Sequence, residues 1–428
     1  MSCSRNRVAQ VVAIVIVAVG AAVLAGVASA GASDGRRAVG TAARLPLGAR
    51  FERGLPAARR LRLTIALKPR DPAALRAYAS AVSTPGAPQY GRYLSVAEFA
   101  RRFGAEPSQL AAVADVMRSG GLRVGAASAN QLTIPVSGTV AQVQRAFAVT
   151  EAHVRLPGGR LAFANDRAPR VAAQIAGGVQ AVIGLDDIAR PVPQDAVRLV
   201  RGAVRRPAAR VRAVGSGPAP CAGAANAAAG MGYTADQIAS AYGIGSYYPS
   251  DMGAGQTVAL VEFEAYDPND IAAYQQCYGT STAISNVEVD GGPGAFSGND
   301  DESGLDIEQV IGLAPGASIR VYQAPAGDSQ LVVLNAIASA NVAKVVSSSW
   351  GMCERFTGLP AIEAESTVLQ EMAIQGQSFF NSSGDSGSTM CYQTPGAGGV
   401  RDTSLSVIDP GGQPFATGVG GTFLGNAN

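Results

Sequence analysis

The sequence predicts an α/β protein in which a parallel sheet flanked by helices forms the second half and a smaller α/β domain precedes it. Two observations in the second half predict the parallel sheet. Short apolar segments alternate with helical patterns and short turns, which is typical of right-handed crossovers over a parallel sheet. The segment QTVALVEF at residues 256–263 is almost continuously apolar, as expected for a strand that is buried on both faces.

The first domain, from about residue 61 to residue 187, has its own alternation of strands and helices. LRLTIALKP alternates like a strand, and DPAALRAYASAV begins with an Asp cap and a Pro in the first turn. SVAEFARRFG has a Ser cap, a Glu three residues later and a Gly stop, which predicts a capped helix. The remaining segments predict a third helix, a strand and a hairpin turn: PSQLAAVADVMRSGG, NQLTIPVSG with the following TVAQVQRAFAV, and LPGGR.

Beyond the first domain the apolar periodicity stops and then resumes. Residues 190–220 are rich in Arg, Pro and Gly, and this composition predicts an exposed linker that is open to cleavage. Further along, DPNDIAAYQQCYG predicts a capped helix. The other expected elements are the strands SIRVYQAP, AKVVSSSWG and QSFFNSSG and helices around Ile307–Leu313, Gln330–Ala340 and Glu363–Gln375. Because ligand sites in parallel sheets lie at the carboxyl ends of strands, SSSWG and NSSGDSG mark a candidate site.

The N-terminus has the pattern of a secretory signal peptide. Arg5 and Arg7 precede an apolar run from Val11 to Val27, and Ala28-Ser29-Ala30 fits a cleavage site of small residues. An uncleaved membrane anchor is the alternative, since the run is nearly long enough to span a bilayer. We expect a secreted, extracellular protein without membrane association after signal cleavage. Its parts are a signal peptide (1–30), a first domain (50–190), a linker (191–219) and a second domain (220–428).

The cysteines agree with export. Cys3 lies within the predicted signal, and the four others allow three different pairings into two disulfides. We favour Cys353 with Cys391 and Cys221 with Cys277. No C-x-x-C spacing occurs, so a zinc site is not expected.

The net charge of +2 conceals a strong difference between the two halves. From Cys221 onward there are four basic residues and 21 Asp and Glu, a net charge of −17, whereas the first 220 residues carry +19. An acidic domain of this kind excludes a nucleic-acid backbone as a partner. A basic first half and an acidic second half attract each other as a propeptide and an enzyme would, although a compositional bias toward Arg is an alternative explanation.

The GDSG sequence at residues 384–387 resembles the nucleophile motif of trypsin-like serine proteases. Such a triad needs an imidazole that accepts the serine proton. The chain has one histidine, His153, and it lies in the first domain, before the linker. A triad with Ser386 is therefore excluded unless His153 reaches across from the first domain, and Cys–His chemistry fails for the same reason.

Acidic residues remain as catalytic candidates. In NDDESGLDIEQVIGL, Glu302 and Asp306 are four residues apart and lie on one face of a predicted helix. Two adjacent carboxylates do not both ionise readily, so they share a proton, and such a pair can act as a general base at low pH. A structural role is the alternative, since acids in the first turn of a helix stabilise its dipole, with Asp300 or Asp301 as the cap.

Several segments, in the right order, resemble the sedolisin (serine-carboxyl peptidase) family. In the second half they are GLDIEQVIGLAPGA with Glu302 just before it, VVSSSWG, NSSGDSG and TGVGGTFL. The first domain resembles the pro-kumamolisin-type activation propeptide of this family in TIALKPRDPAAL, STPGAPQYGRYLSVAEFARRFG, LTIPVSGTVAQVQRAF and VIGLDD. The resemblance extends from about residue 60 to the last residue.

The resemblance implies a subtilisin-like fold and catalysis by Ser, Glu and Asp, with a second Asp at the oxyanion hole. Glu302 would be the general base and Asp306 its carboxyl partner. Asp385 would be the oxyanion residue, because a protonated carboxyl group can donate a hydrogen bond to the developing oxyanion. An Asx turn is the alternative role for Asp385, and Ser386 would be a turn residue.

One part of the family pattern is missing from the sequence. The family's nucleophile lies in a G-T-S-x-x-x-P segment downstream of the oxyanion Asp, and no G-T-S occurs in these 428 residues. We therefore expect the catalytic serine to lie beyond the end of this chain. We also expect further parts of the sheet beyond the end of this chain, so the sheet would be C-terminally incomplete here. The ligands of the calcium ion that the family implies are expected there too.

The favoured function is a secreted, acid-acting serine-carboxyl endopeptidase made as a zymogen. Its expected partners are protein or peptide substrates and its own propeptide, and we expect a monomer. The alternative is a catalytically inactive truncated relic or a secreted peptide-binding protein. Trp350 is expected in the substrate groove or in the core, and Glu262, Glu264 and Asp267 are expected to be solvated acids at the edge of the sheet.

Overall fold

The computed structural model describes residues 35–193, 217–298, 301–392 and 402–422. By their contacts, residues 36–428 group together and apart from residues 1–35. The predicted signal peptide and most of the predicted linker lie outside the described residues, so both stay predictions.

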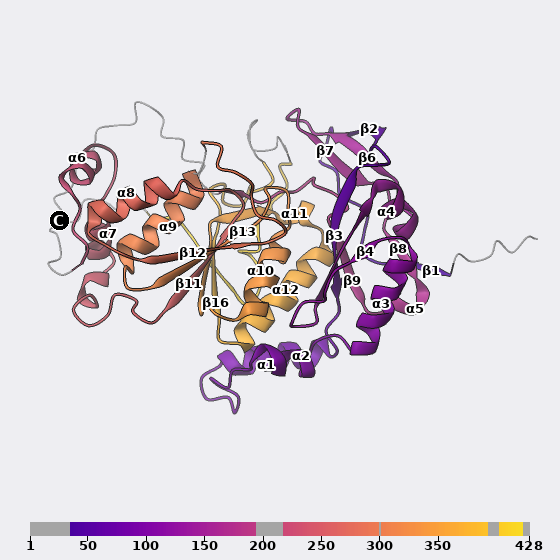
Figure 1. Cartoon of the computed structure of the whole chain (residues 1–428), viewed down its shortest axis with the longest axis horizontal. Coiled ribbons are helices and arrows are strands. Elements are labelled where there is room, and N and C mark those ends of the chain that lie inside the picture. Colours follow the sequence, from indigo (N-terminus) through magenta and orange to yellow (C-terminus); the bar gives the residue numbers. More distant parts are fainter. Residues whose placement is uncertain (1–34, 194–216, 299–300, 393–401, 423–428) are drawn as a thin grey trace, which may run out of the picture. The chain divides into compact units, whose positions relative to one another are not determined.

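The described part of the second half is built around a six-stranded sheet in which every neighbouring pair is parallel (Figure 1). In spatial order the strands are β12 (Ala283–Glu288), β13 (Ser318–Gln323), β11 (Thr257–Glu262), β14 (Val345–Ser348), β16 (Ser378–Ser382) and β18 (Ala416–Val419). The predicted α/β class with a helix-flanked parallel sheet is therefore confirmed.

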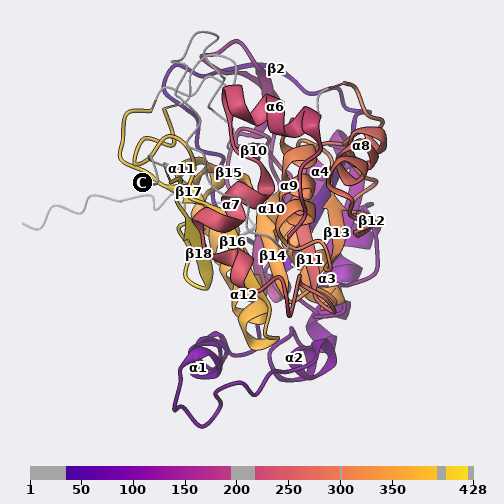
Figure 2. The ribbon, with the colours of Figure 1, turned by 90° about the vertical axis from the view of Figure 1, so that its left-hand side faces the viewer.

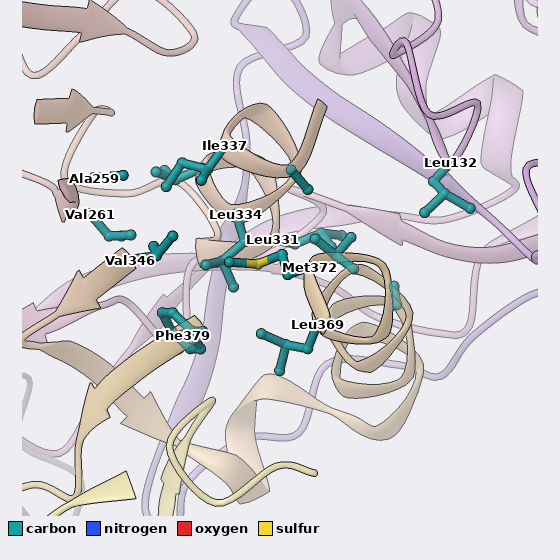
Figure 3. Packing of buried hydrophobic residues seen from close by; sticks show 14 of the residues in the cluster. Leu132, Ala259, Val261, Leu331, Leu334, Ile337, Val346, Leu369, Met372 and Phe379 are labelled. Atoms are coloured by element: carbon teal, nitrogen blue, oxygen red, sulfur yellow. The ribbon is translucent and has the colours of Figure 1, made fainter. Parts of the chain in front are cut away.

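Helices cover both faces of this sheet because the central strand is apolar on both sides. Val258 and Leu260 of β11 pack into one cluster with residues of α8 (Pro268–Tyr278) and α9 (Asp301–Leu313). The alternating residues Ala259 and Val261 pack into another cluster, with α10 (Gln330–Ala340) and α12 (Leu359–Ile374), as Figure 3 shows. QTVALVEF is thus almost continuously apolar because its strand is buried on both faces, as predicted.

Most of the predicted helices are present with the expected capping. The Asp267 side chain accepts a hydrogen bond at the start of α8, and Gly279 ends that helix in the left-handed conformation. Helix α10 has the predicted bounds. Helix α12 begins earlier than predicted, with Pro360 in its first turn, where proline needs no hydrogen-bonded N–H. The remaining helices of the second half are α6 (Ala222–Met231), α7 (Ala235–Ala241), a 3₁₀ turn (Ile244–Ser246) and α11 (Glu354–Thr357).

The described part of the first domain combines three antiparallel sheets, one of them the two-stranded pair of β1 (Arg36–Ala38) and β8 (Arg170–Ala172), with short helices. A second sheet has the order β4 (Arg123–Val124), β5 (Thr133–Thr139), β3 (Arg60–Leu67) and β9 (Val179–Ile183). The third contains β2 (Arg50–Gly54), β6 (Glu151–Arg155) and β7 (Leu161–Asn165). The helices are α1 (Pro72–Ser83), α2 (Val96–Arg102), α3 (Pro107–Ser119), α4 (Val140–Phe147) and α5 (Ala173–Ala176).

The first domain shares a hydrophobic core with α10 and α12 of the second half. Leu75 and Ala79 of α1 and Phe99 of α2 are buried in the cluster that contains Leu334 and Met372. Figure 1 accordingly shows α1 and α2 beside the end of α12. Because this cluster is continuous, the two halves stabilise each other through apolar burial.

A short three-stranded antiparallel sheet lies beside the large one. Its order is β10 (Val192–Pro193), β15 (Trp350–Cys353) and β17 (Ile408–Asp409), and Figure 2 labels these strands together. The first residues of the predicted linker therefore pair with the second half of the chain instead of lying free.

Candidate active site

Three parallel strands end at one edge of the large sheet, where the sequence predicts the site. Strand β11 ends at Glu262, β14 at Ser348 and β16 at Ser382, and the parallel register aligns their carboxyl ends. Helix α9 begins against this edge. Its first turn is capped by Glu264, whose Oε1 accepts the backbone N–H groups of Glu302 and Ser303 at 3.0 and 3.1 Å.

Helix α9 begins at Asp301, so it contains both Glu302 and Asp306, as their predicted placement on one helix face requires. A carboxylate from the loop after β11 thus bonds to the first turn of α9, a contact that the local sequence does not predict. Of the predicted caps, Asp300 and Asp301, Asp300 lies outside the described residues. Glu264 therefore has a structural contact in place of the solvated position predicted for it.

Glu302 and Asp306 lie together, as their spacing predicts, and a third carboxyl group joins them. Asp306 lies close enough to Glu302 and Glu262 for both groups to influence its pKa. Glu302 is 3 % exposed and Glu262 is fully buried. We call Glu262, Glu302 and Asp306 the carboxyl cluster. Since Glu262 comes from β11 and the other two come from α9, the cluster fastens the helix to the end of the central strand.

Neutral donors hold the carboxyl cluster in place. Ser303 Oγ and Trp350 Nε1 donate to the same oxygen, Glu262 Oε2, at 2.7 and 2.8 Å. Ser349 Oγ donates to Asp306 Oδ1 at 2.7 Å. Trp350 is 4 % exposed and packs edge-on against Phe263, so of its two predicted positions the core is correct.

Burial raises the pKa values of two members of the carboxyl cluster, Glu262 and Asp306. The pKa of Glu262 is raised well above its ordinary value, first by burial and then by the negative charge of Asp306, while the bonds from Ser303 and Trp350 oppose the shift. Burial also raises the pKa of Asp306, and the bonds from Ser349, Glu262 and Glu302 oppose it. Adjacent buried carboxyl groups of this kind favour a state in which a proton is shared between them.

The predicted exposure of Glu262 is wrong. Glu262 follows a buried apolar strand and points under α9, where Ser303 and Trp350 satisfy it. A usable signal was present in the sequence, because an acid that directly continues an apolar strand at the carboxyl end of a parallel sheet lies at the usual place of a site. Ser349 and Trp350 stand in SSSWG, which the sequence marks as part of a candidate site without assigning them contacts to Asp306 and Glu262.

Asp385 lies in the loop after β16, two strands away from β11, and its side chain is exposed. The carbonyl oxygen of Ser386 accepts the N–H of Thr389 at 3.0 Å, which places Ser386 in a turn as predicted. The disulfide between Cys353 and Cys391 joins the end of β15 to this loop. His153 lies on β6 of the first domain, which contributes no residue to the carboxyl cluster.

Strand β10 occupies the edge of β15 beside the carboxyl cluster. Val192 pairs with Gly351 and Pro193 with Trp350 in antiparallel register. An extended peptide in this register runs toward Ser349, the residue that bonds to Asp306. The side chain of Val192 packs on an apolar cluster that includes Phe356 and Ile408. The site therefore has an edge that binds extended chain next to its acids.

Neither a metal nor a membrane segment is apparent in the described residues. In residues 35–193, 217–298, 301–392 and 402–422, no group of three or more His, Cys, Asp or Glu side chains is placed to hold a metal ion. The calcium ion implied by the family thus has no fitting ligand set there. No helix in the same ranges is both long and apolar enough to cross a bilayer. Both favoured disulfides, Cys221–Cys277 and Cys353–Cys391, are confirmed.

These features define a class of protein, in which an α/β activation domain precedes a parallel-sheet domain with clustered carboxyl groups at its carboxyl edge. The family described as Pro-kumamolisin, activation domain, matches residues 48–188. The chain is also similar to three peptidases. It is 32 % identical to kumamolisin from Bacillus sp. (strain MN-32), over 79 % of this chain and 58 % of that protein.

The other two relatives agree with kumamolisin. Xanthomonalisin from Xanthomonas sp. (strain T-22) is 27 % identical over 85 % of this chain and 45 % of its own length. Sedolisin from Pseudomonas sp. (strain 101) is 27 % identical over 85 % of this chain and 60 % of its own length. The chain belongs to the sedolisin family and carries its pro-kumamolisin activation domain. It spans about half the length of the relatives it matches.

A solved structure of the epidermin leader peptide processing serine protease from Staphylococcus aureus aligns with a TM-score of 0.39 and 9 % identity. The alignment covers 84 % of this chain and 70 % of that one. A likeness at this level supports no statement about the site.

Proposed function

We propose that this chain is the zymogen form of a secreted serine-carboxyl endopeptidase that hydrolyses peptide bonds at acid pH. The observation that carries the proposal is the carboxyl cluster, where Glu262, Glu302 and Asp306 meet beside an edge that binds extended chain. Histidine is absent from the whole second half of the sequence, so a base that works at low pH has to be a carboxylate.

In this proposal Glu302 takes the proton from the attacking hydroxyl group. Asp306 bonds to Glu302 and stabilises the proton that arrives, while Glu262, held by Ser303 and Trp350, orients Asp306. Asp385 donates a hydrogen bond to the oxyanion in its protonated form. The hydroxyl group itself is expected from the family's G-T-S segment, which these 428 residues do not contain.

The first domain acts as an inhibitor in the same proposal. Strand β10 lies along β15 where a peptide substrate would pair, and the shared core with α10 and α12 holds the domain in place. Arg62 of the first domain donates to the carbonyl oxygen of Asp290 at 2.9 Å, which adds a polar contact. Cleavage in the Arg-rich linker would release the edge of β15. Two disulfides are typical of exported proteins and support secretion.

The test uses the protein produced from its complete gene and measures hydrolysis of an unfolded protein at acid pH. Glu302→Gln is expected to lower the rate by about a hundredfold or more, since a positioned general base contributes 10²–10⁴-fold. Glu288→Gln, at an exposed position on β12, is the control and should hydrolyse like the unchanged protein. Retention of the full rate by Glu302→Gln would show that the mechanism is wrong.

A non-catalytic peptide-binding protein is the second candidate, because β15 pairs with β10 without any chemical step. It predicts no turnover at any pH and the same peptide affinity in the Asp385→Ala variant. Turnover that depends on Glu302 would exclude it.

A further inference from the structure

A second pair of buried acids lies apart from the carboxyl cluster, where α12 meets β17. Glu365 of α12 is fully buried, and Asp409 of β17 is 2 % exposed. Neither side chain has a part in the proposed mechanism. Buried carboxyl groups are costly unless they are paired with donors or neutralised, so their presence calls for a physical role.

The contacts of this pair supply few donors. Gln413 Nε2 donates to Asp409 Oδ1 at 2.7 Å and to Glu365 Oε2 at 3.2 Å, so one amide serves both carboxyl groups. Because the same amide nitrogen lies within hydrogen-bond distance of both groups, the two carboxyl groups are close together, and their proximity favours a state in which one of them carries a proton. The backbone of Leu331 lies near Glu365 and the side chain of Thr357 lies near Asp409, and both groups are neutral.

Among the described residues, the charged groups around the pair give no compensation for a second negative charge. Glu354 of α11 acts on Asp409 and is itself acidic. The guanidinium group of Arg355, on the same helix, pairs with Asp402 at 3.2 Å. From α10 the facing group is the backbone of Leu331, and from the loop after β17 it is the amide of Gln413. The pair is stable when the two carboxyl groups share one proton. It is destabilised by repulsion between two buried negative charges when both acids are ionised.

We propose that Glu365 and Asp409 form a positioning pair that shares one proton, fastens β17 to α12 and loosens when both groups ionise. Strand β17 pairs with β15, since Asp409 is opposite Met352 and Ile408 opposite Cys353. Strand β15 in turn carries Trp350, which donates to Glu262, and presents the edge that pairs with β10. The pair thereby sets the pH range in which the edge of β15 is ordered. The inference rests on the proposed function only where it describes this edge as peptide-binding.

The sign of the pH effect follows from the direction of the shifts. Burial and the mutual charge raise the pKa of Glu365 well above its ordinary value, and burial raises that of Asp409. A group whose pKa is raised on folding stabilises the protein fully below its ordinary pKa. This contribution is lost as the pH rises through the raised, folded-state value. The β15–β17 edge is therefore firm in acid and loosens toward neutral and alkaline pH.

The experiment measures amide hydrogen exchange in the full chain between pH 4.5 and pH 8, expressed as protection factors corrected for intrinsic rates. In the unchanged protein, protection of the β15 and β17 amides should fall by up to about tenfold per pH unit, the limit for one proton. In Glu365→Gln and in Asp409→Asn this fall should become several-fold smaller. Amides of β13, which carries no acid, serve as the internal reference.

Coupling between the two acids supplies a second, independent readout. The effects of Glu365→Gln and Asp409→Asn on the urea midpoint at pH 7 should be strongly non-additive, because either change removes the same charge pair. Glu371→Gln is the matched control, since Glu371 is a buried acid on the same helix whose hydrogen-bond partners are Asn130 and Gln375, and its effect should add to that of Asp409→Asn.

Additive effects of the pair, or an unchanged pH dependence of β15 and β17 protection in whichever variant folds, would overturn the proposal. No peptide hydrolysis is measured, so the outcome does not depend on whether the chain is an active enzyme. Conversely, full activity of Glu302→Gln would refute the proposed mechanism and leave the role of Glu365 and Asp409 standing.

Discussion

Asn130 is the side chain whose removal should most directly loosen the first domain from the second half. It is fully buried, and its Nδ2 donates to Glu371 Oε2 at 2.6 Å and to Asn335 Oδ1 at 2.8 Å. Asn335 returns a bond to the Thr133 hydroxyl at 3.0 Å. These contacts join the strand region of the first domain to α10 and α12, so a change at Asn130 acts on the interface and not on the active site.

The magnitude follows from the two acceptors that Asn130→Ala leaves without their donor. A buried polar group that loses its partner costs about 1–3 kcal/mol, so the expected loss for the two acceptors is about 2–6 kcal/mol. If that loss is confined to opening of the interface, the open population rises at least about thirtyfold, at 1.4 kcal/mol per factor of ten. Addition of a protease at low concentration should then cut the linker correspondingly faster.

The control and the refuting result come from Glu371. A cycle of Asn130→Ala with Glu371→Leu should show a coupling of at least about 1 kcal/mol in urea unfolding, followed through the single tryptophan, Trp350. Effects that add within about 0.5 kcal/mol would refute the contact as an energetic link.

The pH dependence of Glu371 sharpens the same test. Burial raises its pKa from 4.5 to about 8, so its stabilising contribution is complete below 4.5 and disappears as the pH rises to about 8. Glu371→Gln keeps an acceptor for Asn130 and cannot ionise, so it should remove this part of the pH dependence.

Three further changes test other contacts. Trp350→Phe removes a donor to Glu262 Oε2, so the pKa of Glu262 should rise further and the pH–rate profile of the complete enzyme should move to higher pH. An unchanged profile would show that Trp350 does not influence the carboxyl cluster. Gly351→Ala would place a Cβ 2.1 Å from Ile408 Cδ1, and the overlap should lower stability by about 1–3 kcal/mol in urea unfolding. Unchanged stability there would mean that Ile408 moves freely. Val192→Asp places a charge against the apolar cluster of Phe356 and Ile408, so β10 should detach and linker cleavage should accelerate, whereas Val192→Ile should not change it.

Local patterns were sufficient to predict the parts of the fold that depend on nearby residues. Apolar runs and caps predicted β11, α8 and α10, because burial on both faces and capping leave a mark within a few residues. The pairing of Glu302 and Asp306 was predictable for the same reason, since one helical turn brings them together. In each of these cases, the spacing of residues along the chain determines the local structure almost without help from distant segments.

Features that depend on distant segments were missed or misjudged. Glu262 was expected in solvent because an acid after an apolar strand usually marks the exit to water, and only the crossing of α9 buries it. The cap of α9 comes from Glu264, 38 residues before Glu302. Strand β10 consists of Val192 and Pro193 in an Arg-rich segment, so no periodicity could reveal that it pairs with β15.

The buried carboxyl groups of the second half also bear on where the protein is most stable. Glu262, Glu365 and Glu371 lie in three different places, and burial is the first cause of the raised pKa in each. Each of them contributes stability that is lost as the pH rises, which is the opposite of an exposed carboxylate paired with a base. A domain with four basic and 21 acidic residues also repels itself more as its acids ionise. Both effects act in one direction, so the second half should be most stable in acid, and the basic first domain should matter most to its stability near neutral pH.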